Sequence, residues 1–292
     1  MLNKIKRTIM KKIVLLISIL AFAIGSTSSL LSDEPRYSDR SDEALELLKA
    51  ANACMQSENI ICAKKKLTAA IALHPDDYEA ILGRGAVYAK DEKWKFAIAD
   101  FKKALELQPN MTNAMFGMAK CLKETDKLDE AQKYCDMAIN VDPDKLSRFG
   151  AVSRYIVRAK FHLDIKKYDE SLKDYDTGID LAGKLPSDGP RETKGINNYI
   201  LSLKIQKNHA LMKMARYDEA INIFKELLAE LPKNHGLMYN LACAYAKIGE
   251  NESAYEFLGK AIEFDEKYKE MAMDDEDFES LYDEDDFLDL TE

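Results

Sequence analysis

A repeat of 34 residues is the feature that most constrains how this chain can fold. Three consecutive segments, 44–77, 78–111 and 112–145, carry similar residues at offsets 4, 8, 11, 20, 24, 27 and 32, counted from the start of each segment. The middle segment shows the pattern best, with Ile81, Gly85, Tyr88, Ala97, Phe101, Ala104 and Pro109. A period of this length indicates one supersecondary unit used several times along the chain.

Within each segment the offsets predict two helices joined by a turn. Offsets 4, 8 and 11 lie on one face of a first helix, and offsets 20, 24 and 27 on one face of a second. Small residues such as Gly85 and Ala97 let the two helices approach closely, while larger residues fill the space around them. A proline such as Pro109 ends the second helix. Because one hairpin cannot bury its own apolar face, we expect stacked hairpins, an all-α solenoid.

Three further segments follow with more drift, at 152–185, 201–234 and 235–268. In the second of these, Lys204 and Asn208 replace the apolar and small residues of the first helix. Two insertions separate the segments. Residues 146–151 are predicted to form a short insertion, at most an extra helical turn. Residues 186–200 open on Pro186 and Pro190 and predict a loop, either a tolerated surface insertion or a partner-contact or hinge loop.

These patterns resemble the tetratricopeptide repeat (TPR), whose small, aromatic and proline positions match Gly85, Tyr88, Ala97, Phe101 and Pro109. The resemblance implies a right-handed superhelix of about six helix hairpins with a C-terminal capping segment. It also implies a non-enzymatic scaffold that binds a peptide segment or a partner protein. In this family the concave surface is lined by offsets 2, 5, 6, 9, 12 and 13 of each first helix.

Applied to this chain, those offsets predict an apolar ridge with lysines around it. The predicted partner-binding residues are Leu48, Asn52, Leu82, Phe116, Lys120, Lys123, Ile156, Lys160, His209, Tyr239 and Asn240. Such a surface suits a partner with apolar anchors and acidic neighbours. The alternative is that part of the ridge packs inside the solenoid and that the lysines are ordinary solvated residues.

One specialisation of the family, a clamp for a terminal carboxylate, implies lysine, arginine and asparagine at set offsets of three successive units. This chain has Leu48, Asn52, Gly83, Asn113 and Gly117 at those places, and only Asn52 matches. The comparison disfavours a receptor for the tails of cytosolic chaperones.

The first 25 residues have the order of a secretory signal peptide: five cationic residues without an acid, then an apolar run over 13–24. The run is too short to span a bilayer comfortably, and Gly25 permits cleavage. We therefore expect a bacterial protein of the periplasm or one that is secreted, with residues 26–43 as a linker. The alternative is an uncleaved anchor in the inner membrane, with the protein facing the periplasm. Only such an anchor would contact a membrane.

Five cysteines, Cys54, Cys62, Cys121, Cys135 and Cys243, would then meet an oxidising compartment. A Cys54–Cys62 disulfide is one arrangement that the hairpin turn allows. The cysteines form no CxxC pair, and the four histidines are scattered, so we expect no metal.

No phosphate loop or nucleophile motif is visible either, so we expect no cofactor and no catalytic residue. Two other functions stay open from the sequence. One is a ligand-binding component of an envelope transport or assembly system, and the other is a thiol-active or enzyme-accessory protein.

The net charge of −9 comes from the end of the chain, because residues 265–292 hold 14 acids and 2 lysines. An acidic balance argues against binding nucleic acid. Residues 269–292 set Met271, Phe278, Leu281, Phe287 and Leu290 among the acids, which predicts a capping segment. The alternative is that this tail folds back into the lysine-bearing groove and competes with a partner. The sequence carries no signal for an oligomeric state.

Overall fold

The computed structural model describes residues 40–187 and 189–292, so the predicted leader and most of the predicted linker lie outside the described residues. The chain divides into two compact units, residues 1–75 and 76–292. The described part of the first unit is a single hairpin of α2 (Asp42–Gln56) and α3 (Ile60–Leu73). In the described residues, no helix combines the length and the apolar character that a membrane span needs.

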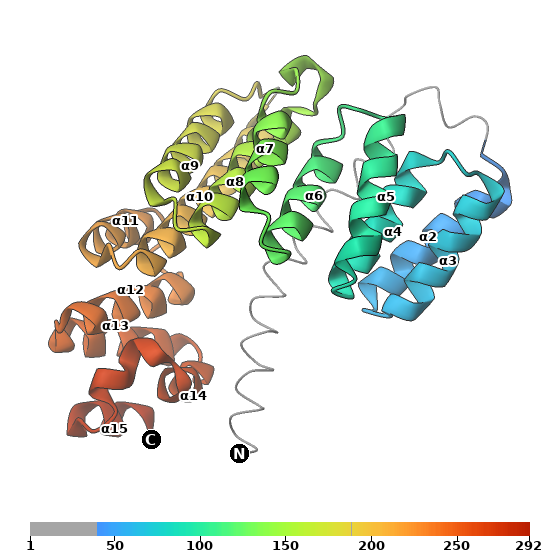
Figure 1. Ribbon diagram of the computed structural model, residues 1–292. Helices are drawn as coiled ribbons and strands as arrows, with labels where there is room; N and C mark the ends of the chain where they lie inside the picture. The colour runs from blue at the N-terminus through green and yellow to red at the C-terminus, as the bar shows by residue number, and fades with distance from the viewer. Residues whose placement is uncertain (1–39, 188) are drawn as a thin grey trace. The chain divides into compact units, whose positions relative to one another are not determined.

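The second unit is a series of helix hairpins in chain order (Figure 1). Its hairpin helices are α4 (Tyr78–Lys90), α5 (Trp94–Leu107), α6 (Thr112–Glu124), α7 (Leu128–Ile139), α8 (Arg148–Asp164), α9 (Tyr168–Gly183), α10 (Pro190–Lys213), α11 (Tyr217–Glu230), α12 (His235–Ile248) and α13 (Asn251–Phe264). With α2 and α3, the described residues form six hairpins. The prediction of an all-α solenoid of about six hairpins is confirmed.

The turn inside every hairpin has the same backbone conformation. The residue at offset 15 has a positive φ, and the next backbone N–H donates to the carbonyl five residues earlier, over 2.8–3.1 Å. This bond satisfies a carbonyl that the end of the first helix leaves unpaired. The six residues are Glu58, Glu92, Asp126, Lys166, Ala215 and Gly249. The repeat therefore extends to the backbone of the turn, although only the last unit uses glycine there.

Small residues at the hairpin interface bring the two helices together. The alanines at offset 20, among them Ala97 and Ala131, are fully buried. Where the pattern drifts to a polar residue, that residue bonds to the backbone of the facing helix. Ser171 Oγ donates to the carbonyl of Ala159 over 2.8 Å, and Asn208 Nδ2 donates to the carbonyl of Ala220 over 3.0 Å. These bonds explain how the drifted hairpins keep the same packing.

Phe101 joins two successive hairpins of the second unit. A Cβ on Gly85 of α4 would lie 2.9 Å from its Cε1 atom, and a Cβ on Gly117 of α6 would lie 2.6 Å from its Cζ atom. Glycine at these two positions leaves the space that the ring occupies, because any side chain there would displace it.

The predicted loop over 186–200 is wrong in most of its length. Helix α10 begins at Pro190, with Gly189 as its N-cap, and continues to Lys213. Proline is favoured in the first turn of a helix because the missing N–H has no partner there in any case. Beyond Pro190, Ile196 and Leu203 are buried on one face of the helix, which explains why the segment is helical.

Two other predicted boundaries shift by a few residues. Residues 148–151 of the predicted insertion form the start of α8, whose N-cap is Ser147, after a short 3-10 helix η2 (Pro143–Lys145). The predicted linker ends earlier than expected, because α2 begins at Asp42 with Ser41 as its N-cap. In both places a serine side chain accepts a backbone N–H of the first turn and so fixes the helix start.

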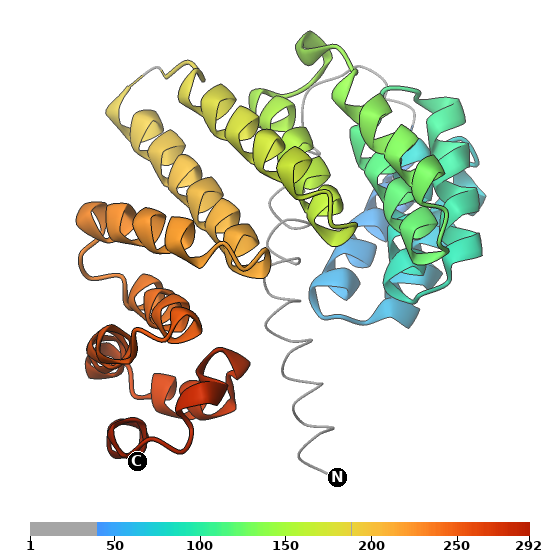
Figure 2. The ribbon, with the colours of Figure 1, turned by 60° about the vertical axis from the view of Figure 1, so that its left-hand side comes forward.

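The C-terminal residues fold against the last hairpin as α14 (Lys267–Asp274), the 3-10 helix η3 (Glu276–Leu281) and α15 (Asp285–Thr291). We call residues 267–292 the C-terminal extension. Figure 2 shows its red segments gathered beside the orange helices α12 and α13. Phe278, Leu281 and Phe287 are buried in the same core as these two helices. The predicted cap is confirmed, and its acids surround the buried side chains of Phe278, Leu281 and Phe287.

The turn conformation makes a prediction for Ala215, which has φ of 56° and no polar side chain to compensate. We expect Ala215→Gly to raise the free energy of unfolding by about 0.5–1 kcal/mol. The left-handed conformation strains a residue with a Cβ, and the added chain entropy of glycine offsets part of the gain.

Urea unfolding followed by circular dichroism measures this change. Ala99→Gly, at an exposed position inside α5, is the control and should lose about 1 kcal/mol. A loss of stability in both variants would contradict the strain at Ala215.

Candidate partner-binding surface

The predicted binding residues fall in both units. Leu48 is half-buried and Asn52 exposed on α2 of the first unit. In the second unit, Leu82 of α4 and Phe116 of α6 are half-buried, and Lys120 of α6 is exposed. A half-buried apolar side chain still presents area to a partner, so these positions keep the character that the sequence predicts.

Two predicted ridge residues are not accessible, which corrects the expectation for them. Ile156 of α8 is 0 % exposed, because its Cδ1 atom fills the space that Gly178 of α9 leaves open. Tyr239 of α12 is 4 % exposed. Its ring packs on Tyr268 and Phe278 of the C-terminal extension. The accessible apolar ridge is therefore interrupted at α8, and at α12 the C-terminal extension covers it.

The extension covers the inner positions of α12 through polar contacts as well. Tyr239 Oη donates to Asp275 Oδ2 over 2.9 Å, and Lys247 Nζ donates to the carbonyl of Glu276 over 3.0 Å. Lys247 also lies 3.4 Å from Asp277 Oδ1. The sequence left open that the C-terminal residues fold back over the inner surface. They do so locally, over α12, the first helix of the sixth hairpin. Because Phe278 is 0 % exposed, this contact is part of the core and not a loose cover.

The cationic region of the surface is smaller than the sequence suggests. Lys123 of α6 is paired with Asp164 of α8 over 2.5 Å and lies 3.3 Å from Glu124. Within the described residues, Lys213 at the end of α10 forms no ion pair. The cationic part of the surface is therefore centred on α8 and α10.

The positive charge of Lys213 acts on both Lys160 and His209. Burial lowers the pKa of Lys160 and the positive charge of Lys213 lowers it further, while the carboxylate of Asp164 offsets part of the shift. The His209 imidazole is solvent-accessible but lies in a recess, and its partial desolvation lowers its pKa, again with a contribution from Lys213. The Asn240 side-chain amide donates to His209 Nε2 over 3.2 Å. An anionic group placed here would relieve the repulsion between Lys160 and Lys213.

Partly buried charge pairs, which the sequence analysis missed, join the helices beneath this surface. Arg158 of α8 donates to both carboxylate oxygens of Asp174 in α9, over 2.8 and 2.7 Å, and to Asp136 of α7 over 2.9 Å. Arg84 and Asp100 form the same forked pair at the same offsets of their own unit. The recurrence of Arg and Asp at offsets 7 and 23 is the sequence signal that could have identified both pairs.

A second set of contacts, made by His162, joins the same three helices, α7, α8 and α9. His162 Nδ1 lies 3.0 Å from Asp174 Oδ2, and its Nε2 lies 3.2 Å from Gln132 Oε1. Burial alone would raise the pKa of Asp174, but His162 and Arg158 outweigh it and hold that pKa below its ordinary value. Asp174 thus stays ionised and anchors Arg158 under the inner surface of α8.

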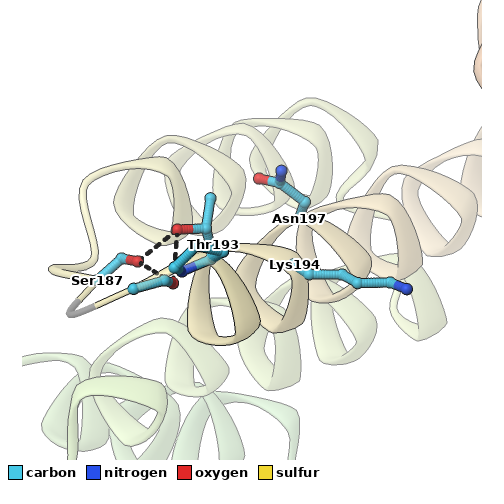
Figure 3. A pocket seen from close by; sticks show the side chains of 6 residues that line it. Ser187, Thr193, Lys194 and Asn197 are labelled. Carbon is cyan, nitrogen blue, oxygen red and sulfur yellow. Dashed lines mark hydrogen bonds between the residues drawn. The ribbon is translucent and has the colours of Figure 1, made fainter.

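Two recesses are present in the second unit. The smaller, of 180 Å³, lies where α10 and α12 meet the extension, and its lining includes His209, Asn240, Cys243 and Asp277. The larger, of 530 Å³, is lined by residues of the segment that leads into α10 and of its first turns. Figure 3 shows Ser187 and Thr193 bonded there at the start of α10. Because those hydroxyls serve the helix start and no predicted site residue is near, we assign no function to the larger recess.

The cysteines divide into one pair and three free thiols. A disulfide joins Cys54 of α2 to Cys62 of α3, which is the pairing that the sequence allowed. Cys121, Cys135 and Cys243 are free and buried. Burial raises the pKa of Cys121 to about 11 and that of Cys135 to about 12. Because the thiolate is the reactive form, these environments argue against a thiol-active protein.

The coupling between Lys213 and His209 makes a second prediction. Lys213→Gln removes a positive charge that lowers the pKa of His209, so that pKa should rise. NMR titration of the histidine ring protons measures it. Lys133→Gln, on the exposed side of α7, is the control and should leave the His209 titration unchanged. A His209 pKa equal in all three proteins would place Lys213 away from the recess.

Comparison with known proteins identifies the repeats. Tetratricopeptide repeat profiles match residues 48–112, 88–153 and 211–273. Among curated proteins, the Hsp70-Hsp90 organizing protein of Triticum aestivum is 26 % identical over 194 residues, which are 60 % of this chain and 33 % of that protein. The Hsp70-Hsp90 organizing protein 1 of Glycine max is 24 % identical, over 62 % of this chain and 34 % of its own length. This chain thus spans about a third of these relatives.

Solved structures share the fold. A tetratricopeptide repeat protein from Parabacteroides merdae superposes with a TM-score of 0.52 at 16 % identity, covering 86 % of this chain and 98 % of that one. A chain of the APC/C hetero-tetramer Cut9-Hcn1 gives a TM-score of 0.56 at 13 % identity, covering 84 % and 43 %. At such identities the likeness concerns the fold alone. The profile matches cover more than half of the sequence, and the protein belongs to the tetratricopeptide repeat family.

Proposed function

We propose that this protein is a non-enzymatic interaction scaffold of the bacterial cell envelope, which binds an acidic peptide segment or partner protein on the inner face of its hairpins. The grouping of Lys160, Lys213 and His209 between α8 and α10 is the observation that carries the proposal. The charge of Lys213 lowers the pKa of both Lys160 and His209, which marks a place of positive potential where an acidic side chain would bind favourably.

Apolar area beside the cations supports a peptide with apolar anchors. Phe116 of α6, Ile205 and Met212 of α10 are half-buried, so each retains accessible area. The closed end at α12 limits the surface, because the extension covers Tyr239. The proposed ligand therefore runs over α4, α6, α8 and α10 and stops beside Asn240.

The relatives favour a scaffold without identifying the ligand. Their names describe organizing proteins of Hsp70 and Hsp90, and this chain spans about a third of their length. The clamp for a terminal carboxylate is not reproduced, since Leu48, Gly83 and Gly117 stand where it needs polar side chains. We therefore propose recognition of acidic side chains along a segment, and not of a chaperone tail.

Export is proposed on two independent features. The leader has the order of a signal peptide, and the Cys54–Cys62 disulfide fits an oxidising compartment. The periplasm is the proposed location of the mature protein, or the outside of the cell if it is released.

Peptide binding can be tested by fluorescence anisotropy with a labelled peptide of glutamates that contains two leucines. We expect binding that weakens as salt rises, and roughly a tenfold loss for the double variant Lys160→Glu/Lys213→Glu, because two attractive charges become repulsive. The double variant Lys95→Glu/Lys133→Glu, at exposed positions of α5 and α7, is the matched control.

A lysine counterpart of the peptide should not bind. Equal loss in both double variants, or equal binding of both peptides, would show non-specific attraction and contradict the proposed surface.

Export is tested by the intact mass of the protein recovered from the envelope fraction of bacteria that express the full chain. We expect the mass without the leader. After unfolding in alkylating reagent without reductant, Cys54 and Cys62 should remain unmodified while Cys121, Cys135 and Cys243 react. Recovery in the cytoplasm with all five cysteines alkylated would contradict both the location and the oxidised pair.

A further inference from the structure

Three potential metal ligands from separate parts of the chain meet where the extension covers α12. The Cys243 Sγ atom and carboxylate oxygens of Asp275 and Asp277 all lie within 4.8 Å of one another. Cys243 belongs to α12, Asp275 is the N-cap of η3, and Asp277 lies in its first turn. The cluster is therefore assembled by the fold-back of the extension.

The Cys243 thiol is the unusual member of this cluster. It is 3 % exposed, and in the described residues no side chain makes a hydrogen bond to it. It also lines the 180 Å³ recess together with His209 and Asp277. Cys243 belongs to the apolar core around α12, and its sulfur also lies beside two carboxylates and the recess, which places a potential ligand there.

Neighbouring groups already hold the two carboxylates in place. Asp275 Oδ1 accepts the backbone N–H of Asp277 over 3.1 Å, and Oδ2 accepts the Tyr239 hydroxyl over 2.9 Å. Asp277 is oriented by Lys247 at 3.4 Å. Metal ligands in proteins are typically supported by such outer contacts, which fix the ligand orientation before the ion arrives.

The charge balance also favours a cation. Two half-buried aspartates, Asp275 and Asp277, face one lysine, Lys247, at this contact. A divalent ion would neutralise this excess of negative charge.

We propose that Cys243, Asp275 and Asp277 bind a divalent transition metal ion of the Zn²⁺ or Co²⁺ type, with the fourth position filled by water. A thiolate with oxygen ligands suits such borderline ions and does not suit Ca²⁺ or Mg²⁺. The ion would join the extension to α12. The sequence spacing gave no hint of it, because the ligands come from two elements that are far apart in the chain.

Binding requires the thiolate, so the step releases a proton. The S–H bond breaks, a sulfur–metal bond forms, and the proton passes to solvent. The affinity should therefore increase with pH. Lys247 loses its contact with Asp277 as the ion takes that carboxylate.

Titration of the metal-free full chain with Co²⁺ tests the site. We expect one ion per chain with thiolate-to-cobalt charge-transfer absorption, which Zn²⁺ abolishes by competition. Cys243→Ala should remove the absorption, and Asp277→Asn should weaken binding by roughly tenfold or more while leaving the η3 backbone bonds intact. Cys135→Ala and Asp286→Asn are the controls, a second buried thiol and an exposed acid of the extension.

Two results would overturn the proposal. One is Co²⁺ binding without charge-transfer absorption, which would show attachment to surface carboxylates only. The other is an equal affinity in Asp277→Asn and Asp286→Asn, which needs no cysteine variant to fold. A thermal unfolding temperature that rises with Zn²⁺ in the native chain but not in Asp277→Asn would further support the joining of the extension to α12.

Discussion

The close approach of two helices within each hairpin is the constraint on which this structure depends. Alanine, glycine or serine at the contact leaves so little space between the helix backbones that larger side chains can be placed only around it. Gly85 and Gly117 have no side chain and so leave space beside the helix backbone. The Phe101 ring fills this space and joins one hairpin to the next. The inner surface exists because this packing repeats in register.

The two ends of the inner surface in the second unit differ in kind. Over α8 and α10 it presents cations that repel one another, supported from beneath by Arg158 and Asp174. At α12 the extension covers it, with Phe278 and Leu281 in the core and acids outside. The net charge of −9 therefore describes mainly the cap, and the protein without leader and extension is close to neutral. A partner would contact a cationic surface that ends at the acidic C-terminal extension.

The sequence predicted what depends on the period and missed what depends on single contacts. The hairpins, their small interface residues and the apolar cap follow from the 34-residue spacing. The loop over 186–200 was misread because Pro190 interrupts a helix interior but suits a helix start. Ile156 and Tyr239 occupy ridge offsets, yet Gly178 and the extension bury them. The forked Arg–Asp pairs recur at offsets 7 and 23 of two units, a signal that the analysis of apolar and small positions did not use. The meeting of Cys243 with Asp275 joins a repeat helix to the extension, where a repeat offset carries no information about partners.

The central claim is that partners bind the inner face of the hairpins, between α8 and α10. Photo-crosslinking in intact bacteria tests it most directly, with the photoreactive residue placed at Lys213 or, as the outward comparison, at Met137 of α7, which is 49 % exposed. We predict a discrete crosslinked protein from position 213 that an excess of the glutamate–leucine peptide removes, and none from position 137. Crosslinks from position 137 alone, or crosslinks from position 213 that the peptide leaves unchanged, would contradict it.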